Sequence, residues 1–105
     1  MPELPEIETA RRGITPHILQ HKVKTVTIRD GRLRWPVPAN LDSILRGQTI
    51  EQVDRRGKYI LIKFRHGWLI LHLGMSGSLR LVPKDTPYRK HDHIELLFDT
   101  NQCLR

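Results

Sequence analysis

Residues 59–73 read Tyr59-Ile60-Leu61-Ile62-Lys63-Phe64-Arg65-His66-Gly67-Trp68-Leu69-Ile70-Leu71-His72-Leu73, and this stretch decides the fold. Two short, strongly apolar runs flank the turn signal His66-Gly67, so the stretch predicts two antiparallel strands joined by a tight connection. Their apolar density is typical of strands that are covered on both faces or that line a closed core. The centre of the chain is therefore expected to be β-structure around one hydrophobic core.

Strand-like segments continue on both sides of this hairpin. Period-two alternation between turn residues is typical of strands, and it predicts further strands over Lys22–Asp30, Arg32–Trp35, Thr49–Arg55, Ser78–Val82, His91–Phe98 and Gln102–Arg105. A brief helix is expected from about Leu41 to Leu45. The predicted fold class is mainly β: an antiparallel β-sandwich, barrel-like, preceded by one N-terminal helix.

That leading helix is predicted from an apolar stripe. Apolar residues recur at helical spacing, namely at Leu4, Ile7, Ala10, Ile14 and Ile18. Pro5 suits the first helical position, where its missing N–H costs nothing. Because Gly13 and Pro16 interrupt the pattern, we expect the helix to be kinked or broken near residue 15.

Size and charge limit the function classes. The 105 residues suit one small domain, and a formal charge of +7 favours a polyanionic partner such as nucleic acid. Charge alone does not separate such a protein from one with an ordinary solvated basic surface. Cys103 is the only cysteine, so this chain can form neither an internal disulfide nor a four-cysteine zinc site. With no apolar run near the ~18 residues of a membrane span, an intracellular protein is expected.

The N-terminus carries unusual chemistry. Removal of Met1 would expose Pro2 as a free secondary amine, and α-amino groups titrate near pH 7.7–8.0 and act as nucleophiles when neutral. Glu3 and Glu6 follow within one turn. Their ordinary interpretation is as carboxylates stabilised by the helix dipole. With Met1 retained, the Pro2 nitrogen would be an amide and could not form a Schiff base.

Four motifs in order resemble one known family: Met1-Pro2-Glu3-Leu4-Pro5-Glu6 with Arg11-Arg12-Gly13, Arg56-Gly57-Lys58-Tyr59, His72-Leu73-Gly74-Met75-Ser76-Gly77-Ser78-Leu79-Arg80, and Lys90-His91-Asp92-His93. Together they resemble the N-terminal domain of bacterial formamidopyrimidine-DNA glycosylase, which removes oxidised purines from DNA. The resemblance runs the whole length of the chain. It implies a β-sandwich preceded by a helix, in agreement with the pattern above.

The resemblance implies three catalytic residues. Pro2 would attack C1′ of the damaged nucleotide, displace the base and form a Schiff base, after which β- and δ-elimination cut the strand. Glu3 would shuttle protons to and from the sugar. Lys58 would contact the phosphate beside the lesion and assist the eliminations, although an isolated lysine at a strand start is ordinarily a solvated one.

Four further residues are implied to contact DNA or the flipped base. Glu6 would lie near the flipped base, and Met75, displayed between glycines, would fill the gap that the base leaves. His72 and His91 would donate hydrogen bonds to phosphates. Further polyanion contacts, which could equally be solvated residues, are expected at Arg29, Arg32, Arg34, Arg55 and Arg56.

The resemblance also implies a domain organisation. Residues 1–105 would be an N-terminal catalytic domain, truncated before a helical DNA-binding domain and a zinc finger. We expect no metal or cofactor in this chain and one structural zinc in the remainder. The partner would be double-stranded DNA containing oxidised bases or abasic sites, and the setting the bacterial cytoplasm at the nucleoid. Alone, this chain is expected to bind DNA weakly, with salt sensitivity, and to excise little or nothing.

Two other function classes stay open. An N-terminal-proline tautomerase would use Pro2 as a general base, but an apolar strand would then be expected directly after the proline. A non-catalytic basic nucleic-acid-binding β-domain would need stacking aromatics on an exposed sheet, whereas a core role is expected for Tyr59, Phe64, Trp68 and Phe98. Full-length family members are implied to be monomers. We also expect Gln102–Arg105 to leave a free strand edge through which two copies of this chain could pair.

Overall fold

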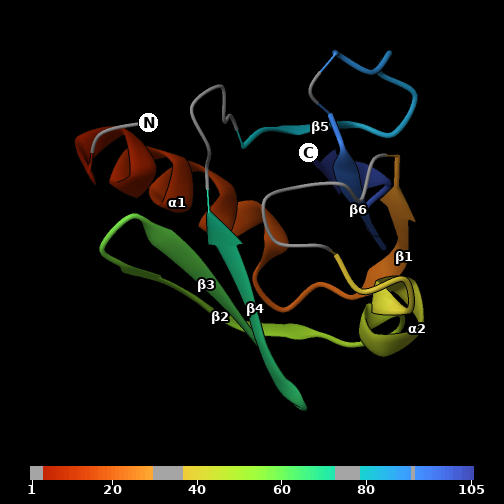
Figure 1. The fold of residues 1–105 in the computed structure, drawn as a ribbon, viewed down its shortest axis with the longest axis horizontal. Coiled ribbons are helices and arrows are strands. Elements are labelled where there is room, and N and C mark those ends of the chain that lie inside the picture. The colour runs from red at the N-terminus through yellow and green to blue at the C-terminus, as the bar shows by residue number, and fades with distance from the viewer. Residues whose placement is uncertain (1–3, 30–36, 73–78, 91) are drawn as a thin grey trace.

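Two antiparallel sheets and two helices make up the part of the chain that the computed structural model describes, which is residues 4–29, 37–72, 79–90 and 92–105 (Figure 1). The elements are α1 (Leu4–Ile18), β1 (Val23–Ile28), α2 (Leu41–Leu45), β2 (Ile50–Arg56), β3 (Tyr59–Phe64), β4 (Gly67–His72), β5 (Leu81–Pro83), β6 (Ile94–Phe98) and β7 (Gln102–Leu104). One sheet has the strand order β1-β6-β7-β5 and the other β2-β3-β4. The predicted class, a mainly β sandwich with a leading helix, is confirmed.

The two apolar runs on either side of His66-Gly67 form an antiparallel hairpin, as predicted. β3 and β4 pair antiparallel, with Tyr59 opposite His72, Leu61 opposite Ile70 and Lys63 opposite Trp68. β2 adds on the other side of β3, so the three strands form a meander. Strand ends shift from the predicted ones by up to about three residues, while α2 keeps its predicted range. The predicted strand Arg32–Trp35 lies outside the described residues.

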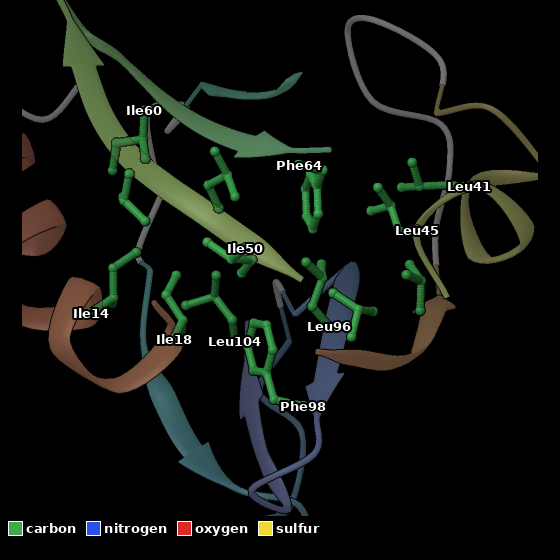
Figure 2. Close-up of a cluster of buried hydrophobic side chains, with 14 of the residues drawn as sticks. Ile14, Ile18, Leu41, Leu45, Ile50, Ile60, Phe64, Leu96, Phe98 and Leu104 are labelled. Atoms are coloured by element: carbon green, nitrogen blue, oxygen red, sulfur yellow. The ribbon is translucent and has the colours of Figure 1, made fainter. Parts of the chain in front are cut away.

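The core lies between the two sheets and is closed by both helices (Figure 2). α1 packs against β2 and β3, and α2 packs against β1. Each element contributes its buried face, because alternate residues of a strand and every third or fourth residue of a helix point the same way. The side chains labelled in Figure 2 are Ile14, Ile18, Leu41, Leu45, Ile50, Ile60, Phe64, Leu96, Phe98 and Leu104.

The leading helix was predicted to be kinked or broken near residue 15, and the break is wrong. α1 continues from Leu4 to Ile18 with Pro16 inside it. A proline so near the end of a helix removes only one backbone hydrogen bond, and the burial of Ile14 and Ile18 holds this last turn in the core. The turn is continued by the amide of Leu19, which donates to the carbonyl of Thr15 at 3.0 Å.

The predicted free edge at the C-terminal end of the chain is also wrong. β7 pairs with β6 on one side and β5 on the other, so it lies inside its sheet. The next residue, Arg105, is buried and pairs with Glu95 at 2.7 Å. Self-association through this strand therefore has no support, because its backbone groups are already paired.

The β2–β3–β4 sheet is covered on one face only. Of the two predicted alternatives, its strands therefore line the core with one face and are not covered on both faces. Phe64 and Phe98 are core residues as predicted, but Tyr59 is 45% exposed and Trp68 is 49% exposed. Both aromatic side chains lie on the face that points away from α1 and the second sheet, in register with the other outward residues. Among the helices described, none has the length and hydrophobicity to cross a membrane.

Candidate functional site

Three of the predicted site residues fall within the described part of the chain: Glu6, Lys58 and His72. The other four predicted site residues lie outside the described residues: Pro2, Glu3, Met75 and His91. Glu6 lies in the first turn of α1 and is exposed. The local structure around these three residues shows how the fold presents them.

Lys58 is positioned by the turn between β2 and β3. Gly57 has a φ of +59°, a conformation that costs glycine little and other residues more. Arg55 fastens this turn, because its guanidinium donates to the Gly57 carbonyl oxygen at 2.9 Å. Lys58 is therefore held at the end of a strand by a defined turn, with its side chain partly exposed.

Glu8 joins that turn to α1. Its carboxylate accepts hydrogen bonds from Arg11 and Arg12, each at 2.8 Å, and from Arg55 at 3.2 Å. The Arg11 guanidinium beside it contributes most to holding the pKa of the Glu8 carboxyl far below its usual range. Glu8 thus stays ionised and links the helix that carries Glu6 to the turn that carries Lys58. This link was not predicted from the sequence, although Glu8 and Arg11 stand at helical i,i+3 spacing.

His72 lies at the same end of the hairpin as Lys58. Its ring and that of Tyr59 have centroids 4.9 Å apart, and the two residues are directly opposite in the β3–β4 register. Because Lys58 directly precedes Tyr59, the fold brings Lys58 and His72 to one corner of the sheet. His72 is exposed and available to a ligand. Tyr59, which we predicted to be a core residue, is instead its stacking partner.

A buried ion pair anchors the segment of the Lys90-His91-Asp92-His93 motif. The Arg80 guanidinium donates two hydrogen bonds of 2.7 Å to the two oxygens of Asp92, and the amide of Arg89 donates a third at 2.7 Å. Arg80 contributes most to holding the pKa of the Asp92 carboxyl well below its usual range. Asp92 is therefore a structural residue that fixes the chain on either side of position 91.

Two of the arginines predicted to contact a polyanion have partners within the protein. Arg29 donates to the Asp92 carbonyl oxygen at 2.9 Å, and its guanidinium lies 4.1 Å from the ring centroid of Tyr88. Arg55 is engaged with Glu8 and Gly57, as described above. The guanidinium of Arg56 lines the outer face of the β2–β3–β4 sheet. Arg32 and Arg34 lie outside the described residues.

No metal centre is present in the described ranges. Over residues 4–29, 37–72, 79–90 and 92–105, no three His, Cys, Asp or Glu side chains gather in a group that could hold an ion. Cys103 is buried, and desolvation raises the pKa of its thiol to about 11. The thiol is thus neutral at physiological pH and is not a ready ligand or nucleophile.

A two-layer antiparallel sandwich with a leading helix and a cationic hairpin corner is the class of domain that these elements define. The family model for the formamidopyrimidine-DNA glycosylase N-terminal domain matches residues 1–105. The chain belongs to this family, and the resemblance inferred from the four motifs is confirmed.

Curated relatives and solved structures agree with this assignment. Formamidopyrimidine-DNA glycosylases from Stutzerimonas stutzeri and Thioalkalivibrio sulfidiphilus are each 57% identical to this chain over 105 residues, which is 100% of this chain and 39% of each relative. A crystal structure of Lactococcus lactis FPG (MutM) with FAPY-dG containing DNA has a TM-score of 0.87 at 36% identity, over 97% of this chain and 39% of that one. The chain thus spans about two-fifths of the length of the proteins it matches.

Proposed function

We propose that this chain is the catalytic N-terminal domain of a DNA glycosylase and AP lyase that removes oxidised purines, such as 8-oxoguanine and formamidopyrimidines. The observation that carries the proposal is that Lys58 and His72 stand at the same corner of the β3–β4 hairpin, in a chain that belongs to this family. A lysine and a histidine at one exposed corner are suited to neighbouring phosphates, because both side chains donate hydrogen bonds to anions.

In the proposed mechanism, the free amine of Pro2 supplies the nucleophile. Its lone pair forms a bond to C1′ while the glycosidic bond breaks, and the base leaves with that electron pair and gains a proton. The sugar ring then opens: the nitrogen loses its proton, its lone pair forms the C1′=N bond of an iminium, and the C1′–O4′ bond breaks as O4′ gains a proton. This iminium accepts electrons during the eliminations, which release first the 3′ phosphate and then the 5′ phosphate. Glu3 moves the protons, and Lys58 holds the adjoining phosphate. Glu6, His72, Met75 and His91 are proposed to contact the flipped base or the duplex.

The proposed partner is double-stranded DNA with an oxidised base or an abasic site. The Lactococcus lactis relatives were crystallised with THF-DNA and FAPY-dG containing DNA, and the charge of +7 is consistent with a polyanionic partner. A helical DNA-binding domain and a structural zinc are proposed for the remainder of such a protein. We further propose that the protein acts in the bacterial cytoplasm.

Covalent trapping tests the nucleophile. A chimera is made in which this chain replaces the matching region of the Stutzerimonas stutzeri glycosylase. Intact-mass measurement verifies that Met1 has been removed. The chimera is then incubated with abasic DNA, and borohydride reduces any Schiff base to a stable covalent adduct. We expect a covalent adduct that Pro2→Gly abolishes and that Lys58→Gln reduces at least tenfold. Lys84→Gln, an exposed lysine in the loop after β5, serves as the matched control. An adduct that survives Pro2→Gly would contradict the mechanism.

The non-catalytic β-domain remains a second candidate because Tyr59 and Trp68 are exposed on a sheet face. Exposed aromatic side chains on a sheet can stack on bases. This candidate predicts DNA affinity that Pro2→Gly leaves unchanged and no trapped adduct in any variant, so the same trapping series separates it from the glycosylase.

A further inference from the structure

Side chains stand in regular rows on the outer face of the β2–β3–β4 sheet. Only the row at one end of this face belongs to the proposed catalytic corner. The register places Asp54, Leu61 and Ile70 in one row across the three strands. A neighbouring row ends on Trp68, and the row at the other end contains Tyr59 and His72. This face forms an open groove of about 890 Å³ lined by Gln52, Asp54, Arg56, Tyr59, Leu61, Trp68 and Ile70.

The apolar side chains of this groove are concentrated on β3 and β4. Ile70 is 62% exposed, and the half-exposed rings of Tyr59 and Trp68 lie on the same face. The other large exposed hydrophobics of the described residues stand elsewhere: Ile44 lies on α2, and Tyr88 is stacked between the guanidiniums of Arg29 and Arg105. A contiguous apolar patch rimmed by polar residues marks an interaction surface more often than a solvated one.

The outer face of the sheet carries only a small share of the positive charge of the chain. The groove lining contains one carboxylate, Asp54, and one guanidinium, Arg56. Lys63 stands in the same outward row as Trp68, with its amine 6.0 Å from the centroid of that ring, so the face carries a formal charge of +1 on a chain of +7. The carboxylate lies in the middle row, next to Leu61 in the register, where it would repel a phosphate backbone. A polypeptide with an apolar stripe and a polar margin matches this distribution better than a nucleic acid does.

The size of the face suits a single helix. Three strands spaced ~4.8 Å apart, with their side chains, present a width comparable to the ~10 Å diameter of an α-helix. Six residues of strand extend ~20 Å, the length of about 13 helical residues. The relatives contain enough polypeptide to supply such a helix, since about three-fifths of their length has no counterpart in this chain, which covers 39% of them.

We propose that the outer face of β2–β3–β4 is the docking surface for an amphipathic helix from the part of the glycosylase that this chain does not span. Tyr59, Trp68 and Ile70 contact the apolar stripe of that helix, and Arg56 pairs with a carboxylate at its margin. Because Tyr59 also stacks on His72, the docked helix fixes one side of the corner that carries Lys58. The inference rests on the domain organisation proposed above and is independent of the chemistry of Pro2.

Thiol accessibility tests this docking directly. Cys103 is buried and its thiol has a pKa raised to about 11, so it does not react readily with N-ethylmaleimide. Ile70→Cys therefore adds one reactive reporter to the chain. Its alkylation rate is measured by peptide-resolved mass spectrometry in this chain alone and in the chimera with the Stutzerimonas stutzeri glycosylase. Gln52→Cys, on the polar margin of the groove, provides a second reporter.

We expect Ile70→Cys to be alkylated at least tenfold more slowly in the chimera than in the isolated chain. Ile44→Cys is the matched control, since Ile44 is 47% exposed on α2, away from this face, and its rate should be the same in both proteins. Equal rates for Ile70→Cys in the two proteins would overturn the proposal. Two other outcomes would also overturn it. Protection of Ile70→Cys that increases with the concentration of the isolated chain would indicate a second copy as the occupant, and protection by added DNA duplex would indicate DNA.

Failure of this proposal is distinguishable from failure of the proposed function. The adduct with abasic DNA is measured on the same chimera without a cysteine reporter. A trapped adduct with no protection of Ile70→Cys leaves the glycosylase assignment standing and removes the docking surface. Protection without any adduct retains the docking surface and removes the lyase chemistry.

Discussion

Single ion pairs hold the segments on which the candidate site residues stand. Arg80 and Asp92 form a bidentate ion pair, and their side chains are 16% and 4% exposed. Arg80 also exchanges backbone hydrogen bonds with Arg105, each at 2.9 Å, so the pair joins the start of β5 to the motif around residue 91. Removing one partner of a buried pair leaves the other charge uncompensated, and this is why such pairs are costly to break.

Substitution of Asp92 should therefore be strongly destabilising. We expect Asp92→Asn to lower the free energy of unfolding by about 3 kcal/mol at pH 7. Because Arg80 depresses the pKa of the folded Asp92 carboxyl, its contribution is fully present above the unfolded pKa of about 4. The contribution decreases progressively below that pH and is fully lost only when the pH falls through the much lower folded pKa, so the destabilisation by Asp92→Asn should be smaller at pH 3 than at pH 7. Urea unfolding at pH 7 and pH 3 measures both effects.

The control for this prediction is Asp85→Asn, a change to an exposed carboxylate in the same loop. It should alter the free energy of unfolding by less than about 0.5 kcal/mol at either pH. A difference between wild type and Asp92→Asn that stays constant from pH 7 to pH 3 would show that the ion pair is not its source.

Two glycines, one inside a helix and one directly after a helix, have different backbone conformations. Gly13 lies in the middle of α1, and Gly47 follows α2 with a φ of +83°. A Cβ added at either position would meet nothing within 4 Å. The two sites therefore differ in backbone conformation and not in available space.

Alanine at these two glycines should have opposite effects. Gly13→Ala should raise the free energy of unfolding by about 0.5–1 kcal/mol, because alanine loses less conformational entropy in a helix. Gly47→Ala should lower it by about 1 kcal/mol, because a left-handed backbone crowds the Cβ of an L-residue. Thermal melts followed by circular dichroism check both values. A stabilising Gly47→Ala would contradict the conformational explanation.

At the scale of the whole molecule, the two sheets have different surroundings. In the β1-β6-β7-β5 sheet, Glu95 of the central strand β6 pairs with the buried Arg105, whose guanidinium also lies 4.2 Å from the Tyr88 ring centroid. The β2–β3–β4 sheet has α1 and the core on one side and the exposed groove on the other. The charged side chains described for the first sheet thus have partners within the protein, whereas the outer face of the second sheet is proposed to bind a partner.

Net charge is also a whole-molecule property and predicts how this chain alone responds to salt. With a charge of +7 and about four phosphate contacts, its affinity for duplex DNA should fall roughly a hundredfold between 50 and 200 mM salt. Fluorescence anisotropy with an 8-oxoguanine duplex and its undamaged counterpart measures this dependence. Affinity that did not change with salt would show that the basic surface is not the binding surface.

Local pattern by itself determined most elements of this protein. The hairpin at residues 59–72 was predictable because two apolar runs of strand length flank a glycine turn. Helix α1 was predictable because Ile7, Ile14 and Ile18 recur at helical spacing. The family was predictable because four motifs stand in the right order. These are properties of neighbouring residues, which a sequence records directly.

Only the tertiary structure decided which apolar surfaces are covered. Both faces of β4 are apolar, so period two could not say that Leu69 and Leu71 pack on the core while Trp68 and Ile70 stay exposed. Nor could it place β7 between β6 and β5. The physical reason is the same in each case: coverage depends on segments far away in the chain, whose approach is set by the packing of the whole sandwich.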